Sequence, residues 1–180
     1  MKKGILSVVL MAATMMLSQS VLAADFIGGG VGMGFGRFNL VPNISIDYAV
    51  NSDITINGWM GLQLNFGTEN NTTTDFMATV FGKYDFIDQN DLDFGIQVGA
   101  NLASSFTLAV GPFVSYEIDS DWTVYADGSI GLLTTGGNPF ERSTITAGAQ
   151  YDVKNDLAVR AEYRMINGKS MFLGSVGYLF

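Results

Sequence analysis

Hydrophobic and polar residues alternate along almost the whole of this 180-residue chain after its first 25 residues. A period of two is typical of β-strands, whose successive side chains point to opposite faces of a sheet. No convincing 3.6-residue repeat of an amphipathic helix occurs in this part of the chain, so the predicted fold class is all-β. The alternation predicts ten strands, at residues 26–36, 43–50, 54–66, 75–86, 92–103, 106–118, 122–133, 143–153, 157–165 and 170–180.

The two faces of the predicted strands differ in chemistry. One face of every strand lacks charged residues, including the first and the last strand. A secreted β-sandwich also alternates, but its edge strands usually carry protective charges. An apolar face that continues through both terminal strands favours a closed antiparallel transmembrane barrel, because open sheet edges are unstable in hydrocarbon. The opposite face carries Asn57, Gln63, Lys83, Asp85, Asp93, Gln97, Asn101, Glu117, Asp127, Gln150, Arg160, Glu162 and Arg164.

Four short acidic turns, each preceded by a tyrosine, set the strand number. They begin at Tyr48, Tyr84, Tyr116 and Tyr151. Short turns lie at the periplasmic side of bacterial outer-membrane barrels, and longer loops lie outside the cell. With both chain ends on the side of the short turns, five hairpins and ten strands are required; eight strands is the alternative. The longer loops are predicted at 37–42, 67–74 and 134–142, with very short connections around 103–106 and 166–169.

The outward aromatic residues fall into two groups by depth, as in the interfacial girdles of membrane barrels. The group near the short turns contains Tyr48, Tyr84, Phe86, Phe94, Tyr116, Trp122, Tyr151, Tyr178 and Phe180. The group near the longer loops contains Phe35, Phe66, Phe76, Tyr163 and Phe172. The two groups support the predicted orientation of the strands across a membrane.

The first 23 residues have the composition of a cleaved export signal. Lys2 and Lys3 form a basic start, residues 5–17 are apolar, and Val21-Leu22-Ala23 precedes a plausible cleavage site. A retained membrane helix is the alternative, but this apolar run is shorter than a membrane span. We therefore expect a signal peptide at 1–23 and one barrel domain at 24–180.

Composition excludes several kinds of partner. Without Lys2 and Lys3, seven basic side chains stand against seventeen acidic ones, which argues against binding to nucleic acid. The chain has no cysteine, so disulfides and thiolate metal sites are excluded. We expect no metal and no cofactor.

The chain ends in Val176-Gly177-Tyr178-Leu179-Phe180, in which apolar and aromatic residues alternate up to a final phenylalanine. This ending resembles the assembly signal of Gram-negative outer-membrane barrels, although the upstream positions Ser175 and Leu173 depart from the fuller pattern. The mature chain as a whole resembles small outer-membrane barrels of the OmpX, opacity-protein and porin-like type. The resemblance implies a place in the cell outer membrane. It also implies two partners, outer-membrane lipid and the barrel assembly machinery, which would read Val176, Tyr178 and Phe180.

Catalysis is not expected. The outer-membrane barrel families that are enzymes, namely lipid A palmitoyltransferases, lipid A deacylases, phospholipases and omptin proteases, rely on a histidine. This chain has none, so an activated serine or an Asp–His pair cannot be built. We predict no catalytic residue; a lipid-modifying enzyme is kept only as a third alternative.

The interior of the predicted barrel is polar and narrow. Four inward rings, at Trp59, Phe81, Phe113 and Tyr125, are expected to face the side-chain-free positions Gly32 and Gly34 and to form a constriction. The predicted lining of the lumen is Trp59, Phe81, Lys83, Phe113, Glu117, Tyr125, Asp127, Arg160, Glu162 and Arg164.

Two main functions follow from these features. The first is a structural or narrow porin-like barrel, whose lumen prefers cations because its inward acids outnumber its inward bases. The alternative is a surface adhesion protein that binds a surface ligand through loops 67–74 and 134–142.

Overall fold

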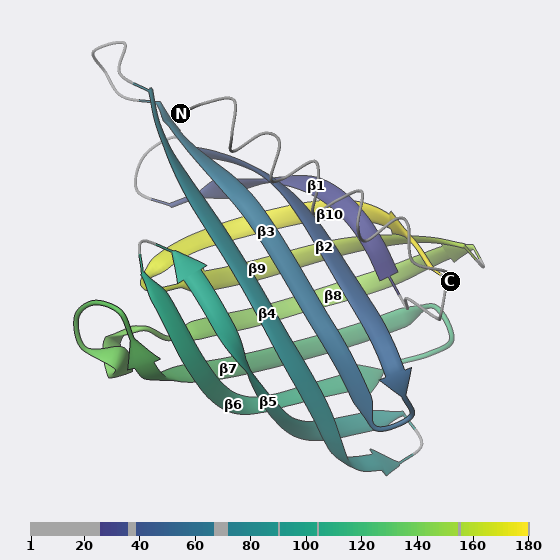
Figure 1. The fold of residues 1–180 in the computed structure, drawn as a ribbon. Helices are drawn as coiled ribbons and strands as arrows, with labels where there is room; N and C mark the ends of the chain where they lie inside the picture. The colour runs from purple at the N-terminus through teal and green to yellow at the C-terminus, as the bar shows by residue number, and fades with distance from the viewer. Residues whose placement is uncertain are drawn as a thin grey trace.

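The computed structural model describes residues 26–35, 39–66, 72–89, 91–103, 105–154 and 156–179. Ten antiparallel strands pair in sequence order, and β1 closes on β10, so the sheet forms a barrel (Figure 1). The predicted fold of ten strands is confirmed. The strands are β1 (Phe26–Gly34), β2 (Asn39–Asn51), β3 (Ile54–Phe66), β4 (Thr72–Gln89), β5 (Leu92–Ala103), β6 (Phe106–Glu117), β7 (Trp122–Thr134), β8 (Thr144–Lys154), β9 (Leu157–Ile166) and β10 (Lys169–Tyr178), with one short 3₁₀ helix, η1 (Pro139–Glu141).

The start of β2 differs from the prediction. The strand begins at Asn39, so the predicted loop 37–42 is wrong from Asn39 to Pro42, and Pro42 lies inside the strand opposite Val31 of β1. Residues 36–38 lie outside the described residues. On the other side of β2, the ladder with β3 is interrupted between Leu40 and Asn43. Proline has no backbone N–H to donate, which explains the interruption and why the residue signals a loop in sequence.

The β3–β4 hairpin is longer than predicted. Strand β4 begins at Thr72, and the ladder between the two strands continues to the pair Phe66–Thr72. The hairpin projects at the upper left of Figure 1. Residues 72–74 therefore belong to a strand and not to the predicted loop 67–74, in keeping with the β propensity of consecutive threonines. Residues 67–71 lie outside the described residues.

The four short acidic turns lie at one end of the barrel, together with Phe26 and Tyr178, the outermost residues of β1 and β10. We call this the turn end, which lies toward the right of Figure 1, and the opposite end the loop end. Three of the four turns follow a β-bulge that lies two residues after the tyrosine. The bulges put an extra outward apolar residue near the turn, at Val50, Phe86 and Val153.

The outer surface of the barrel is apolar. Large exposed side chains cover the outward face of every strand, and no charged side chain lies on this face among the strand residues whose side chains are described. Aromatic rings cluster near both ends, for example Phe35 with Phe172 at the loop end and Trp122 with Tyr151 at the turn end. The fold class is that of a transmembrane β-barrel. Within the described ranges, no helix has the length and apolarity needed to cross a membrane.

Candidate functional site: the barrel interior

Apolar side chains fill the part of the interior nearest the loop end. They come from β2, β3, β4 and β5 and from β9 and β10, and each is 4% exposed or less. We call this cluster the apolar plug. Its members are Val41, Trp59, Met77, Ala103, Ile166, Met171 and Leu173. The plug joins β3, β4 and β5 to β9 and β10 across the lumen, beside buried polar side chains of β5, β6 and β8 such as Asn101, Thr107 and Thr144.

Each inward ring lies against a glycine on a neighbouring strand or on its own strand. Phe81 of β4 is opposite Gly99 of β5, and a Cβ atom on that glycine would lie 2.7 Å from the ring. Phe113 meets Gly95 in the same way, at 2.8 Å. The rings thus fill the lumen at positions where the adjacent residue has no side chain. The other two pairs are Tyr125 with Gly148 and Trp59 with Gly61.

The predicted partners of these rings are wrong. The space beside Gly32 is taken by Leu173, and the space beside Gly34 by Asn39 and Gln63. Gly32 lies opposite Leu173 in the β1–β10 ladder, which sets this contact. The alternation of inward and outward residues along each strand correctly places the four rings inside the barrel. Which glycine each ring contacts depends on the register between neighbouring strands.

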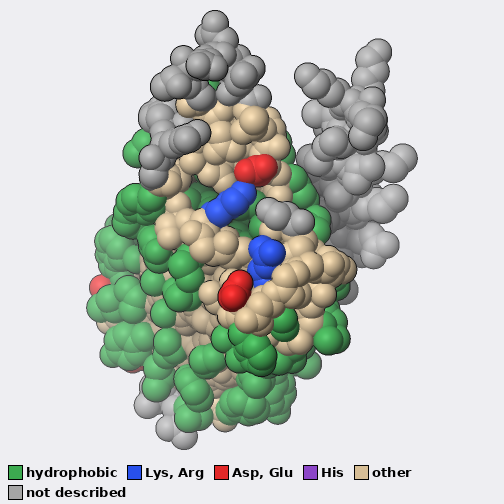
Figure 2. All heavy atoms as spheres, turned by 90° about the vertical axis from the view of Figure 1, so that its left-hand side faces the viewer, with side chains coloured by type: hydrophobic (Ala, Val, Ile, Leu, Met, Phe, Trp, Pro, Cys, Tyr) green, Lys and Arg blue, Asp and Glu red, His purple; other side chains and the backbone are tan. Residues whose placement is uncertain are grey.

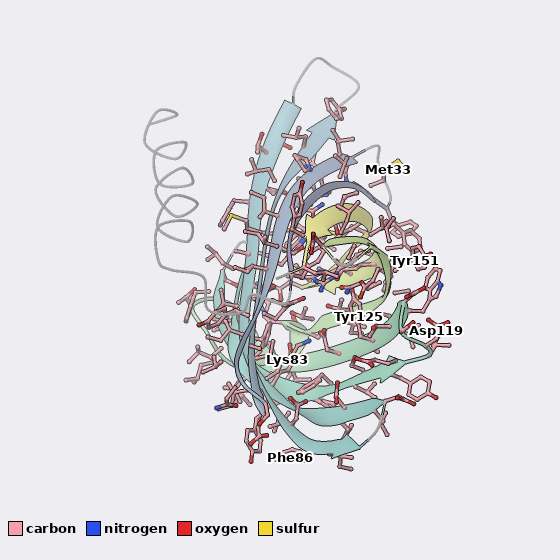
Figure 3. The ribbon with its side chains drawn as sticks, turned by 90° about the vertical axis from the view of Figure 1, so that its right-hand side faces the viewer. Met33, Lys83, Phe86, Asp119, Tyr125 and Tyr151 are labelled. Carbon is pink, nitrogen blue, oxygen red and sulfur yellow. The ribbon has the colours of Figure 1, made fainter. Side chains whose placement is uncertain are left out.

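A polar cavity of about 300 Å³ occupies the interior toward the turn end. In Figure 3, which views the barrel from that end, Lys83 and Tyr125 point into the barrel, whereas Met33, Phe86 and Tyr151 point away from it. Six carboxyl groups and three basic groups line the cavity. The charged lining residues are Asp47, Asp85, Asp93, Glu117, Asp127, Glu162, Lys83, Arg160 and Arg164.

Arg160 is the centre of a hydrogen-bonded chain at the edge of this cavity. Its guanidinium pairs with Asp47 at 2.5 Å and donates from Nε to Gln150 Oε1 at 2.5 Å. It also lies 3.5 Å from the centre of the Phe26 ring. Asp47 accepts a further hydrogen bond from Asn57. Since only 8% of Arg160 is exposed, these contacts compensate the burial of its charge.

Arg164 joins opposite walls of the barrel. From β9 it reaches Thr79 Oγ1 on β4 at 3.4 Å, and it pairs with Glu162 at 3.3 Å. Its guanidinium carbon lies 4.9 Å from the centre of the Trp59 ring, so it packs on the apolar plug. The hydroxyl of Tyr125 donates to Glu162 Oε1 at 2.7 Å. Arg164 therefore marks the boundary between the polar cavity and the plug.

Lys83 and Asp127 form a second contact across the lumen, from β4 to β7. The Lys83 ammonium lies 3.7 Å from Asp127 Oδ2 and 5.1 Å from the centre of the Phe113 ring. Gln97 Nε2 donates to Asp127 Oδ1 at 3.3 Å. These contacts link the four consecutive strands β4 to β7 at the wall of the polar cavity.

The predicted lining residues separate into two groups in the structure. Trp59 belongs to the apolar plug, and Phe81 is 3% exposed against Gly99. The residues that line the polar cavity are Lys83, Phe113, Glu117, Tyr125, Asp127, Arg160, Glu162 and Arg164. Sequence reasoning missed the plug itself, although a signal was present: apolar residues such as Met77 and Met171 occupy inward positions that are polar elsewhere.

At the loop end, side chains bridge the mouth of the barrel. Lys169 Nζ of β10 donates to Asp75 Oδ2 of β4 at 2.8 Å. Asn167, in the β9–β10 turn, donates to the Ala103 carbonyl at 3.2 Å and to Asn101 Oδ1 at 3.4 Å, both on β5. Figure 2, which looks onto this end, shows basic and acidic side chains side by side near its centre. These contacts cover the plug.

The loop between β7 and β8 also lies across the opening of the barrel at the loop end. A Cβ atom on the inward residue Gly131 would clash with the carbonyl of Pro139, at the start of η1. Asn138 caps this helix by accepting from the Phe140 N–H at 3.1 Å. The predicted loop 134–142 is therefore an ordered segment, and the ring of Phe140 is 69% exposed at its surface.

The predicted assembly signal lies at the end of β10. Val176 and Tyr178 point outward, with 51% and 61% of their surface exposed. Phe180 and the signal peptide at 1–23 lie outside the described residues. Among the residues that are described, no group of three or more His, Cys, Asp or Glu side chains could hold a metal ion.

Comparison with solved structures places the fold among β-barrels. No protein-family model matches the chain, and no curated protein matches it in sequence. The outer-membrane protease OmpT from Escherichia coli is similar with a TM-score of 0.54 at 10% identity, over 87% of this chain and 94% of that one. At this identity the likeness shows the fold alone.

Two further structures resemble the chain at lower scores. The KdgM porin has a TM-score of 0.48 at 15% identity, over 86% of this chain and 99% of that one. A designed transmembrane β-barrel has a TM-score of 0.46 at 18% identity, over 90% and 99% of the two chains. The finer resemblance to the OmpX and opacity-protein type stays a prediction.

Proposed function

We propose that this protein is a porin-like barrel of the bacterial outer membrane, with a narrow and gated pathway that is closed in the present conformation. The division of its interior carries the proposal: a polar cavity of about 300 Å³ toward the turn end and an apolar plug toward the loop end. A hydrated ion could enter the cavity but could not cross the plug without a rearrangement. The turn end would face the periplasm, as short turns do in bacterial barrels.

The pathway would prefer cations. Carboxyl groups outnumber basic groups six to three in the lining of the cavity, so its electrostatic potential favours positive ions. Arg160 and Arg164 are paired with Asp47 and Glu162, which leaves the excess charge of the cavity negative.

Conductance of the refolded protein in planar bilayers tests this function. We expect brief or small currents and, in a gradient of potassium chloride, a reversal potential that indicates cation preference. A large steady current without gating would contradict the proposed closed state. A reversal potential that indicates anion preference would contradict the proposed role of the carboxyl groups.

A second candidate function is adhesion to a surface ligand through the loop end. The observation that favours it is the exposed Phe140 ring, held on a short helix by the Asn138 cap and by an Arg142 contact to the Gly136 carbonyl at 3.5 Å. An adhesin of this kind would lose binding to host cells in a Phe140→Ala variant, while its bilayer currents would not change. Catalysis is not proposed, because the chain has no histidine to activate a nucleophile.

Location and assembly follow from the same proposal. The protein would be exported by residues 1–23, surrounded by outer-membrane lipid, and inserted by the barrel assembly machinery through its last strand. The outward side chains of Val176 and Tyr178 support this, because a partner can reach them from outside the sheet. A fractionation that recovers the folded protein without detergent would contradict the membrane location.

A further inference from the structure

The tip of the β9–β10 hairpin is attached to the opposite wall only through side chains. Asn167 and Gly168 form its two-residue turn, with φ angles of 51° and 78°, as in the tight hairpins that favour Asn-Gly. From this tip, Lys169 reaches Asp75 on β4, and Asn167 reaches Asn101 and Ala103 on β5. We call these contacts the latch.

The latch lies directly above the apolar plug. Ile166 and Met171, which flank the turn, are buried members of the plug together with Ala103 and Met77 from the opposite wall. A movement of the tip away from β4 and β5 would therefore withdraw two apolar side chains from the lumen. The same movement would break the latch, so the two events are coupled.

The tip is paired with both neighbouring strands up to Ile166, opposite Thr144 of β8, and Met171, opposite Gly34 of β1. Beyond the last paired residues, the Asn167 N–H donates to the Ser143 carbonyl at 2.9 Å, and the Phe35 N–H donates to the Ser170 carbonyl at 3.0 Å. The latch itself is partly open to water, since the side chains of Lys169 and Asp75 are 32% and 47% exposed. Ion pairs of this kind are weak, so they can open and close.

We propose that the β9–β10 tip is the gate of the pathway, and that the Lys169–Asp75 pair and the Asn167 contacts hold it closed. This inference rests on the proposed porin-like function. It names the element that moves, residues 166–171, and the wall that it leaves, the ends of β4 and β5. The movement would also break the last pairs of the sheet, Ile166 with Thr144 and Met171 with Gly34. In the closed state the tip seals the loop end; in the open state the polar cavity would communicate with both sides of the membrane.

Single-channel recording of latch variants tests the gate. Lys169→Gln and Asp75→Asn should each raise the ratio of open to closed time about two- to fivefold, the effect expected of a partly exposed ion pair. The double variant should resemble either single variant, because both changes break the same contact. The matched control is Glu141→Gln. Among the described residues this carboxyl group accepts from Asn138 of its own loop alone, at 3.5 Å, so the change should leave the ratio unchanged.

A reversible crosslink gives a second readout. The chain has no cysteine, so Ala103→Cys with Asn167→Cys would introduce the only thiols. Oxidation should abolish the currents, and reduction should restore them. If the latch variants and the oxidised crosslinked protein conduct as the wild type does, the gate is overturned but the porin-like function is not. The absence of currents from every variant, including Trp59→Ala in the plug, would overturn both.

Discussion

Phe81 of β4 lies opposite Gly99 of β5, and a Cβ atom on that glycine would lie 2.7 Å from the ring. The pairs Phe113 with Gly95 and Tyr125 with Gly148 repeat this relationship farther round the barrel. A narrow barrel must fill its interior with side chains, and a large ring next to a missing side chain does so without overlap. The inward glycines are therefore part of the packing and not a sign of an open lumen.

The first prediction is that Gly99→Ala destabilises the barrel by about 1–3 kcal/mol, because the new methyl group would overlap with Phe81 and with the Val80 carbonyl. The measurement is the midpoint of urea unfolding after refolding in detergent. Gly82→Ala is the control, since its Cβ atom would meet nothing closer than 3.8 Å. Equal losses in the two variants would show that the ring does not need the space beside Gly99.

A second prediction concerns Arg160, whose guanidinium is bound by Asp47, Gln150 and the Phe26 ring. Arg160→Ala should cost about 3–5 kcal/mol, because it leaves the buried Asp47 carboxylate without its countercharge. Urea unfolding would measure the loss. Arg160→Lys should recover part of it, since an ammonium keeps the charge but cannot make the two contacts of the guanidinium.

The matched control for Arg160 is Arg142→Ala at the loop end. Within the described part of the chain, the Arg142 guanidinium makes one weak hydrogen bond, to the Gly136 carbonyl at 3.5 Å, so the change should alter stability by less than about 0.5 kcal/mol. If removal of either arginine had the same small effect, the chain of contacts around Asp47 would not contribute to stability.

The sequence predicted the strand number and the inward or outward direction of side chains, because both depend on local alternation. The side chains of Trp59 and Arg160 lie inside the barrel and those of Val176 and Tyr178 lie outside it, as the alternation along their strands predicts. The prediction failed for the start of β2, where Pro42 has the local signature of a loop but is tolerated beside an interrupted ladder.

The contacts across the lumen could not be predicted. Whether Arg164 meets Thr79, or Lys169 meets Asp75, depends on the stagger of the strands around the barrel and on the shape of its cross-section. Bulges add to this difficulty, because each bulge shifts the register between two strands by one residue. The hydrophobic pattern of the sequence gives no clear signal of this shift. The plug and the latch are consequently structural findings.

A third prediction tests the lipid-facing surface. Val98 points outward from β5 and is 59% exposed, so Val98→Arg should cost about 2–4 kcal/mol in a bilayer, where the charge would be placed in hydrocarbon. Folding equilibria in lipid vesicles would measure this loss. Phe140→Arg is the control, because that ring is exposed on η1, outside the strands. A cost for Phe140→Arg as large as that for Val98→Arg would argue against the proposed position of the membrane.

The fourth prediction concerns assembly through the end of the chain. By the alternation of the sequence, Phe180 shares the outward face of Val176 and Tyr178, while Leu179 is on the opposite face. Phe180→Asp should therefore reduce the fraction of folded protein in the outer membrane more than Leu179→Asp does. The folded fraction can be read from the faster migration of unheated barrels on gels. Equal assembly of the two variants would contradict both the register and the signal.

The last prediction is that Trp59→Ala opens the lumen. The Trp59 ring is 2% exposed in the apolar plug, and the Arg164 guanidinium at the edge of the polar cavity packs on it. Removal of the ring would leave a gap in the plug next to the polar cavity, so the bilayer conductance should rise above that of the wild type. The change should also cost about 3–5 kcal/mol, so folding must be checked first on unheated gels.

Trp122→Ala is the matched control for this change, because it removes the same side chain from the outward face of β7, where it is 44% exposed. It should leave the conductance unchanged, since no atom is removed from the lumen. Trp59→Phe should keep the lumen closed, because a smaller ring still occupies the space beside Gly61. A wild-type protein that already conducts as well as Trp59→Ala would show that the plug does not close the lumen, and the proposed gate would then have nothing to seal.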